Sequence, residues 1–285
     1  GRHRVARPPI EGEPAAGHQR EGASFALLDL RGIEGARVAG GYIRRVSPLP
    51  APATQSSFNT PHGSAVGPDG ALYFAASGDN RVLRLADDGT LSLFASITTP
   101  TDIVFDSTGA AFIYSLPGRI WKVPAGGGTP VLFAGNGTCS HTGNGGPAAA
   151  ATICPGSTRL SIGPDDSLYF DGGSYVRKIA TDGTITALPG DAPGQITAIT
   201  ATTGDVYVAR WHQIFRNDGG SLVRVAGAEQ PGFAGDGGPA MTARFGQITD
   251  LELGDDGALY ALDGNDNFRV RRIVVGGDVT TVAGN

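Results

Sequence analysis

Lysine and long apolar runs are both scarce in this chain of 285 residues. No run approaches the roughly 18–20 apolar residues that a membrane helix needs, so we expect no membrane insertion. The net charge is −5, which gives no electrostatic reason to expect binding to nucleic acid or anionic lipid. Glycine is abundant, with 45 residues, and 40% of the chain is apolar, which excludes general disorder. Short apolar runs between glycine-rich turns predict an all-β protein.

Cysteine occurs only twice, as Cys139 and Cys154, and both residues fall in one irregular, glycine-rich segment. A bond between them would close a loop of 15 residues and contribute about 3 kcal/mol in the chain-entropy model. The sequence therefore predicts a disulfide, and with it a secreted, extracellular or cell-surface protein. Two free thiols in a cytosolic protein are the alternative.

One pattern recurs along the chain: a small apolar strand, an Asp-Gly turn, an aromatic anchor, a polar turn and an arginine-bearing strand. Repetition of a four-strand unit is typical of propellers, and hairpin turns such as Asp88-Gly89 support the strand count. We therefore expect a six-bladed β-propeller of four-stranded antiparallel blades over residues 24–285, after a loose segment or strap at 1–23. The anchors are Arg37, Tyr73, Phe112, Tyr169, Tyr207 and Tyr260, and the blade boundaries are 24–59, 60–96, 97–153, 154–191, 192–245 and 246–285.

The copies resemble NHL repeats. The segments that carry this resemblance are Pro61-His62-Gly63, Asp69-Gly70, Leu72-Tyr73 and Asn80-Arg81-Val82. Two longer insertions contain Gly143-Asn144-Gly145-Gly146-Pro147-Ala148 and Gly235-Asp236-Gly237-Gly238-Pro239-Ala240, which are similar to a segment of teneurin-like and bacterial secreted NHL propellers. Pro147 and Pro239 suit the start of a short helix, and we expect these insertions to join one blade to the next. A phosphate-binding loop is not expected, because no lysine accompanies the glycines.

The first strand of each blade should line the central axis. With Gly63 aligned to Thr197 of the fifth copy, a period of two places Asp29, Asp102, Arg159, Asp250 and Glu252 on the channel side. These residues either sit in a water-filled channel as simple ion pairs or form a site for a divalent cation. Calcium at Asp102 and Asp250 is the cation prediction, because calcium collects several oxygen ligands. A resemblance to gluconolactonase propellers also implies an axial divalent metal.

Histidine and tryptophan supply the remaining candidates. His62 and His212 are predicted at the same rim of the propeller, where either could act with Asp102 in acid/base catalysis. The Pro61-His62-Gly63 segment is similar to repeats of streptogramin lyases. Trp211 is an exposed-turn aromatic that could anchor a partner, together with His212, Arg159, Asp29 and Glu252. Turn histidines without a shared role and simple packing of Trp211 are the alternatives.

Three functional hypotheses follow. The first is an extracellular recognition module that binds a protein or glycan through its loop-rich top face. The second is a small-molecule lyase or hydrolase, divalent-metal dependent or not, with its site at the opening of the central channel. The third is a structural domain of a larger polypeptide. A propeller fold alone does not separate them, because propellers host many activities.

Overall fold

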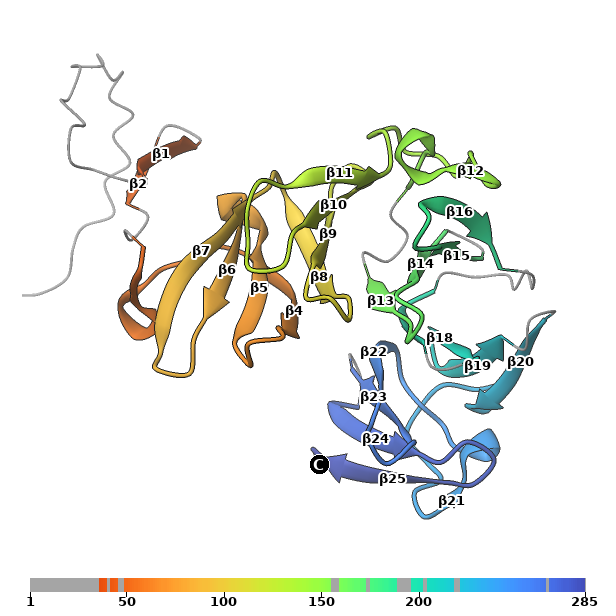
Figure 1. Ribbon diagram of the computed structural model, residues 1–285. Helices are drawn as coiled ribbons and strands as arrows, with labels where there is room; N and C mark the ends of the chain where they lie inside the picture. The colour runs from red at the N-terminus through yellow and green to blue at the C-terminus, as the bar shows by residue number, and fades with distance from the viewer. Residues whose placement is uncertain are drawn as a thin grey trace, which may run out of the picture.

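The computed structural model is an all-β propeller in which five antiparallel sheets lie side by side around a common centre (Figure 1). In these five sheets the first strand lies toward the centre and the last strands lie at the periphery, so the first strands are arranged around the axis. We call the end of the axis where these strands begin the rim, and the end where they stop the base. The structure describes residues 36–39, 42–45, 49–154, 159–172, 175–188, 196–201, 204–217, 221–264 and 267–284.

Each blade takes its four strands in chain order. Blade 1 contains β4 (Pro61–Val66), β5 (Leu72–Ala76), β6 (Arg81–Leu85) and β7 (Thr90–Ser96). Blade 2 contains β8 (Pro100–Phe105), β9 (Ala111–Ser115), β10 (Arg119–Val123) and β11 (Val131–Ala134). Blade 3 contains β13 (Leu160–Ile162), β14 (Leu168–Asp171), β15 (Val176–Ile179) and β16 (Thr184–Ala187). Blade 4 contains β17 (Ala198–Ala201), β18 (Val206–Arg210), β19 (Gln213–Asn217) and β20 (Leu222–Ala226). Blade 5 contains β22 (Ile248–Leu253), β23 (Leu259–Asp263), β24 (Arg269–Ile273) and β25 (Asp278–Ala283).

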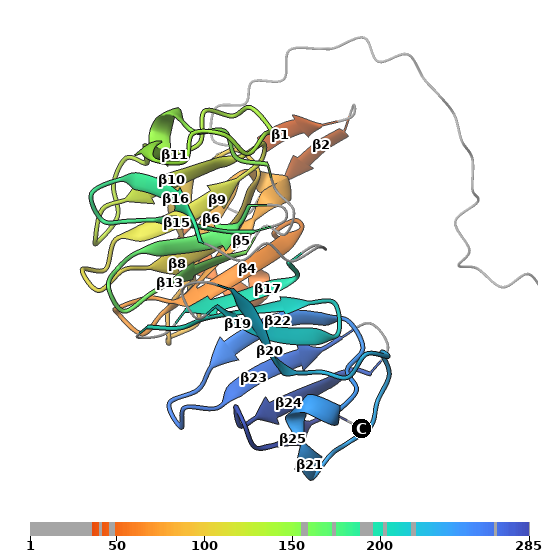
Figure 2. The same cartoon turned by 90° about the vertical axis from the view of Figure 1, so that its right-hand side faces the viewer.

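Blades 1, 3 and 5 each add a fifth strand at the outer edge. The added strands are β3 (Ala51–Pro52) on β7, β12 (Gly146–Pro147) on β16 and β21 (Gly238–Pro239) on β25. Figures 1 and 2 both show β21 beside β25. A short 3₁₀ turn follows each added strand, η1 (Ala53–Gln55), η3 (Ala148–Ala150) and η4 (Ala240–Thr242), and a fourth, η2 (Ser77–Asp79), follows β5.

Each of the two insertions connects one blade to the next and pairs with the second blade, as the sequence predicts. The first runs from β11 to β13 and the second from β20 to β22, and each lays its Gly-Pro dipeptide against the last strand of the blade that it enters. The predicted short helices are single 3₁₀ turns, with Pro147 and Pro239 at the cap position rather than inside the turn. The Cys139–Cys154 disulfide is confirmed and lies in the first insertion.

The expected count of six blades is wrong, because the described residues form five. The predicted first copy, 24–59, pairs differently from the others. Its strands β1 (Ala36–Ala39) and β2 (Tyr42–Arg45) form a separate two-stranded sheet, and β3 becomes the fifth strand of blade 1. Residues 1–23 and Asp29 lie outside the described residues. No helix within the described ranges has the length and hydropathy of a membrane span.

The core of the molecule lies between neighbouring blades. Tyr73 of blade 1 packs with Ile103 and Ile113 of blade 2, and Tyr207 of blade 4 packs with Leu251 and Ala261 of blade 5. The same face of blade 5 has no described blade beyond it: Leu262 is 44% exposed, whereas its counterpart in blade 4, Ala209, is fully buried. Among the described residues, one face of blade 5 is therefore not covered by a neighbouring blade.

Candidate functional site

The pairing of the first and second strands sets three layers of side chains along the axis. In every blade the aromatic anchor of the second strand pairs with one residue of the first strand, as in Ala65 with Tyr73 and Glu252 with Tyr260. This paired residue of the first strand belongs to the middle layer. The rim layer is two residues before it, and the base layer is the residue directly after it. The rim layer holds Gly63, Asp102, Arg159, Ala198 and Asp250, the middle layer Ala65, Val104, Ser161, Thr200 and Glu252, and the base layer Val66, Phe105, Ile162, Ala201 and Leu253.

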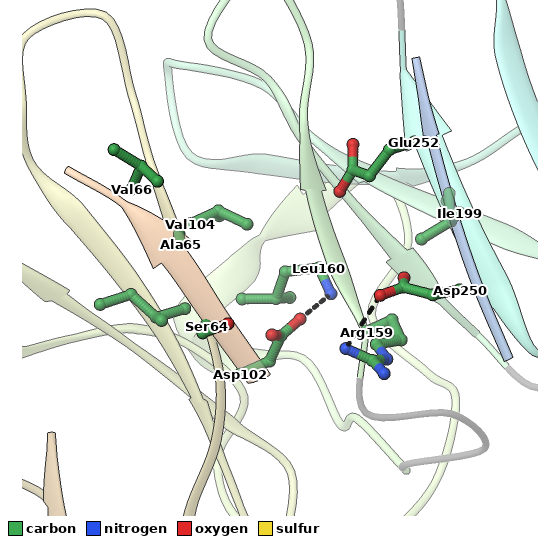
Figure 3. Close-up of a pocket in the computed structure, with 11 residues that line it drawn as sticks. Ser64, Ala65, Val66, Asp102, Val104, Arg159, Leu160, Ile199, Asp250 and Glu252 are labelled. Atoms are coloured by element: carbon green, nitrogen blue, oxygen red, sulfur yellow. Dashed lines mark hydrogen bonds and ion pairs between the residues drawn. The ribbon is translucent and has the colours of Figure 1, made fainter. Parts of the chain in front are cut away.

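A cavity of about 320 Å³ lies at the centre of these layers. Figure 3 shows the charged side chains of its lining, with Asp102, Arg159 and Asp250 near one another and Glu252 farther along the strands. Three of the four predicted carboxyl groups and the predicted guanidinium thus face one small space, while the fourth carboxylate, Asp29, lies outside the described residues. The lining comprises Ser64, Ala65, Val66, Asp102, Ile103, Val104, Arg159, Leu160, Ile199, Asp250 and Glu252.

Asp102 is the most enclosed of these charged groups, with 5% of its surface exposed. Its Oδ2 accepts a hydrogen bond from the backbone N–H of Leu160, in the next blade, at 2.7 Å. Burial raises the pKa of the Asp102 carboxyl to about 7, and the nearby Asp250 carboxylate adds to this rise. The Leu160 N–H and the Arg159 guanidinium act in the opposite direction. Asp102 is therefore poised between its acid and its carboxylate near neutral pH.

Gly63 makes the position of Asp102 possible. A Cβ atom at residue 63 would lie 1.8 Å from Asp102 Oδ1 and 2.9 Å from its Cα. Any side chain there would displace the carboxyl group, so the glycine is required by the close approach of β4 and β8. Sequence reasoning missed this role, although a glycine inside a strand was the signal for it. It also missed the Leu160 N–H, which no side-chain pattern can reveal.

Asp250, Arg159 and Glu252 form the accessible part of the site. Arg159 Nη1 and Asp250 Oδ2 lie 3.9 Å apart, which is a loose ion pair, and both side chains are partly exposed. Glu252 lines the same cavity; desolvation by the walls and the Asp250 charge raise its pKa, against a lowering by Arg159. With three carboxyl groups against one guanidinium, the cavity favours a cation over an anion.

One strand alignment needs a correction. The sequence alignment places Thr197 level with Gly63, but the strand register places Ala198 there, because Ala198 pairs with Ala209 two residues after the Tyr207 anchor. The fourth first strand is thus shifted by one residue. Its contribution to the cavity is the apolar Ile199, so the charged groups come only from the second, third and fifth blades among the described residues.

The structure does not gather the predicted acid/base set around the cavity. Asp102 lines it, but neither His62 nor His212 does. His62 is exposed on β4 beside Gly63. The His212 ring turns toward the second insertion, with Nε2 3.2 Å from the Glu229 carbonyl oxygen. Catalysis by these residues stays a prediction.

Trp211 stands at the rim next to the site. It occupies the turn between β18 and β19 with a left-handed φ of 53°, and 56% of its surface is exposed. Its carbonyl oxygen accepts a 2.7 Å hydrogen bond from the N–H of Ile248, two residues before Asp250. A bulky residue with positive φ is uncommon and costs free energy, so the exposed ring is held at this position despite a strained backbone.

A metal site is not supported by the surrounding geometry. Among the described residues, no group of three or more His, Cys, Asp and Glu side chains could hold a metal ion. Asp102 Oδ2 is occupied by the Leu160 N–H, and Asp250 faces Arg159. These residues do not fit the several oxygen ligands that calcium requires. Calcium at Asp102 and Asp250 stays a prediction.

Comparisons with known proteins identify the fold. No family model matches the sequence, and no curated protein matches it. Among solved structures, a streptogramin B lyase has a TM-score of 0.53 at 18% identity, covering 78% of this chain and 67% of the lyase. A gluconolactonase from Xanthomonas campestris has a TM-score of 0.55 at 14% identity, covering 79% of this chain and 75% of that one. An auxiliary nutrient-binding protein from Bacteroides ovatus has a TM-score of 0.59 at 16% identity, covering 80% of this chain and 58% of that protein.

These similar structures include two enzymes and one binding protein, and all are less than 25% identical to this chain. Such likeness carries the architecture and leaves the activity open, because one propeller scaffold supports many functions. The chain is, on its strand topology and on these similarities together, a β-propeller.

Proposed function

We propose that this propeller is a recognition module that binds its ligand in the axial cavity, through a positively charged group that donates hydrogen bonds. The observation that carries the proposal is the composition of the lining, in which Asp250, Glu252 and Asp102 outnumber Arg159. Carboxylates in a partly enclosed space interact strongly with ammonium groups and accept hydrogen bonds from hydroxyl groups. An amino group on a glycan or on a protein partner has this chemistry.

The exposed residues of the rim support entry of the ligand into the axial cavity from that end. Trp211 is exposed, and its carbonyl oxygen is hydrogen-bonded to Ile248, which lies two residues before Asp250 on the same strand. Exposed aromatic rings are common anchors for partners and sugars. We therefore place the approach of the ligand on the rim, which is the loop-rich top face expected from the sequence.

The disulfide supports a location outside the cytosol. Disulfides such as Cys139–Cys154 persist in oxidising compartments and are rare in cytosolic proteins. A secreted or surface-displayed binding protein, alone or as part of a larger polypeptide, agrees with this chemistry.

Isothermal titration calorimetry with glucosamine and glucose tests the proposal. We expect glucosamine to bind and glucose to bind at least tenfold more weakly. Asp250→Asn should weaken glucosamine binding, whereas Arg159→Gln should strengthen it by removing a like charge. Asp278→Asn, which changes an exposed carboxylate on β25, is the matched control and should have no effect. Weaker glucosamine binding by Arg159→Gln, or equal binding of both sugars, would overturn the proposal.

A lyase or hydrolase is the second candidate, and one observation favours it. The pKa of Asp102, raised to about 7 by burial, suits a general acid or base at neutral pH. The names of similar structures suggest the substrates to assay, which are gluconolactone and a streptogramin B. Turnover that is abolished by Asp102→Asn would support this candidate. Absence of turnover with both compounds would leave the binding role as the better account.

A further inference from the structure

The base layer of the axis is entirely apolar. It consists of the last residue of each first strand: Val66, Phe105, Ile162, Ala201 and Leu253. We call these five residues the apolar ring. The rim layer at the other end of the same strands holds all of the charge except that of Glu252. The axis is therefore polarised, with charged groups toward the rim and apolar groups at the base.

The apolar ring is accessible. Val66 is 67% exposed and Leu253 is 39% exposed, while the other three are partly exposed. Four ring residues line a second cavity, which is shallow, open to solvent and about 570 Å³ in volume. The polar side chains beside it satisfy each other, because Asp166 accepts hydrogen bonds from both the N–H and the hydroxyl of Ser107. The side chains that stay open to solvent in this cavity are therefore mainly those of the apolar ring.

The two cavities follow each other along the same strands. Val104 and Glu252 line the charged cavity, and the next residues of their strands, Phe105 and Leu253, line the apolar cavity. The remaining ring residue, Val66, lines the charged cavity itself. At about 3.3 Å per residue, the three steps from Asp250 to Leu253 span about 10 Å. An octyl chain extended from a head group beside Asp250 would therefore reach the apolar ring.

We propose that the axial site binds an amphiphile, with a cationic head group at Asp250 and Glu252 and an apolar tail directed to the apolar ring. The charge of the head group follows from the excess of carboxyl groups in the lining, and the tail follows from the ring. This inference rests on the proposed function, since it assigns a ligand class to the same cavity. A free long-chain amine is the simplest molecule with both features.

Calorimetric titration with ethylammonium, butylammonium and octylammonium chlorides tests the tail separately from the head. We expect affinity to rise with chain length, by up to about fourfold per methylene group. Leu253→Ser, outside the charged cavity, should flatten this rise without changing the affinity for ethylammonium. Val66→Ser should flatten the rise as well. Asp250→Asn should weaken binding of all three amines by a similar factor.

Two substitutions on β11 provide matched controls. Val131, at 62% exposed, matches Val66, and Leu132, at 37% exposed, matches Leu253. Val131→Ser and Leu132→Ser should leave the chain-length dependence intact, and circular dichroism should show all variants folded.

The outcomes distinguish the two proposals. Octylammonium binding no tighter than ethylammonium would overturn the amphiphile while leaving cation recognition in place. Chain-length dependence that survives Leu253→Ser and Val66→Ser would also overturn it, because the tail would lie elsewhere. Failure of every amine to bind would overturn the proposed function itself, and preference for octanoate over octylammonium would overturn the assigned charge of the head group.

Discussion

A single buried carboxyl group dominates the chemistry of the axis at the scale of residues. Asp102 is held in place by the N–H of Leu160 in the next blade and by the space that Gly63 leaves open. Its enclosure raises its pKa to about 7, so its protonation state changes in the physiological range.

Asp102→Asn should change the pH dependence of stability. The native pKa of about 7 lies above the ordinary aspartate value of 3.8, so the native state binds the proton more tightly than the unfolded state. The contribution of Asp102 to the free energy of unfolding is therefore present below about pH 4 and is lost as the pH rises through about 7. Relative to the wild type, Asp102→Asn should gain up to about 4 kcal/mol between pH 4 and pH 8.

Urea unfolding at both pH values measures this difference. Asp278→Asn removes an exposed carboxylate and should show a nearly constant difference from the wild type. A constant difference for Asp102→Asn as well would mean that the native pKa of Asp102 is close to its unfolded value.

At the scale of elements, each insertion is held by a buried arginine of the blade that it joins. Arg177 on β15 is fully buried and donates hydrogen bonds to Asn144 Oδ1 and to the carbonyl oxygens of Thr142 and Thr152. Arg271 on β24 is its counterpart, and it forms an ion pair with Asp236 at 2.6 Å. The Asn or Asp of the Gly-Asn/Asp-Gly-Gly-Pro motif therefore binds the next blade.

Arg177→Ala should destabilise the protein by about 3 kcal/mol, because the carbonyl oxygens of Thr142 and Thr152 lose a charged donor and a cavity remains where the fully buried side chain was. Arg84→Ala is the matched control. Arg84 pairs with Asp69 at the surface, where each side chain is about one-third exposed, and its loss should cost less than about 1 kcal/mol. Equal costs for the two variants in denaturant unfolding would mean that the insertion is not anchored by Arg177.

At the scale of the whole molecule, each blade packs an apolar face against the following blade, and only the corresponding face of blade 5 has no described blade to pack against. The Tyr207 side chain is 7% exposed between blades 4 and 5, whereas Tyr260, at the same position of blade 5, is only partly buried. The stability of each blade therefore depends on its following neighbour, as in other repeat architectures.

Tyr207→Ala and Tyr260→Ala test this arrangement as a pair. Tyr207→Ala should cost about 3–5 kcal/mol, because it removes a buried aromatic ring from the core between two blades. Tyr260→Ala should cost only about 1 kcal/mol, since less apolar surface is buried there. A cost for Tyr260→Ala as large as that for Tyr207→Ala would show that another element covers this face in solution.

Local sequence patterns were sufficient to predict the repeated four-strand unit. Strand alternation, Asp-Gly turns and the recurring anchor Tyr73, Phe112, Tyr169, Tyr207 and Tyr260 encode the four-strand unit over short stretches of chain. The same period of two correctly predicted that Asp102, Arg159, Asp250 and Glu252 face the axis. The position of both cysteines in one glycine-rich segment predicted the disulfide.

The blade count, the register of blade 4 and the protonation of Asp102 were decided by contacts between distant parts of the chain. β3 joins β7 across nearly 40 residues, and the Asp102 carboxyl meets the Leu160 N–H across 58 residues. Edge pairing and burial depend on which backbone and side-chain groups arrive from elsewhere, and no local periodicity contains that information. For this reason the repeated four-strand unit could be predicted from the amino acids, whereas the number of blades and the protonation state of Asp102 depend on the folded chain.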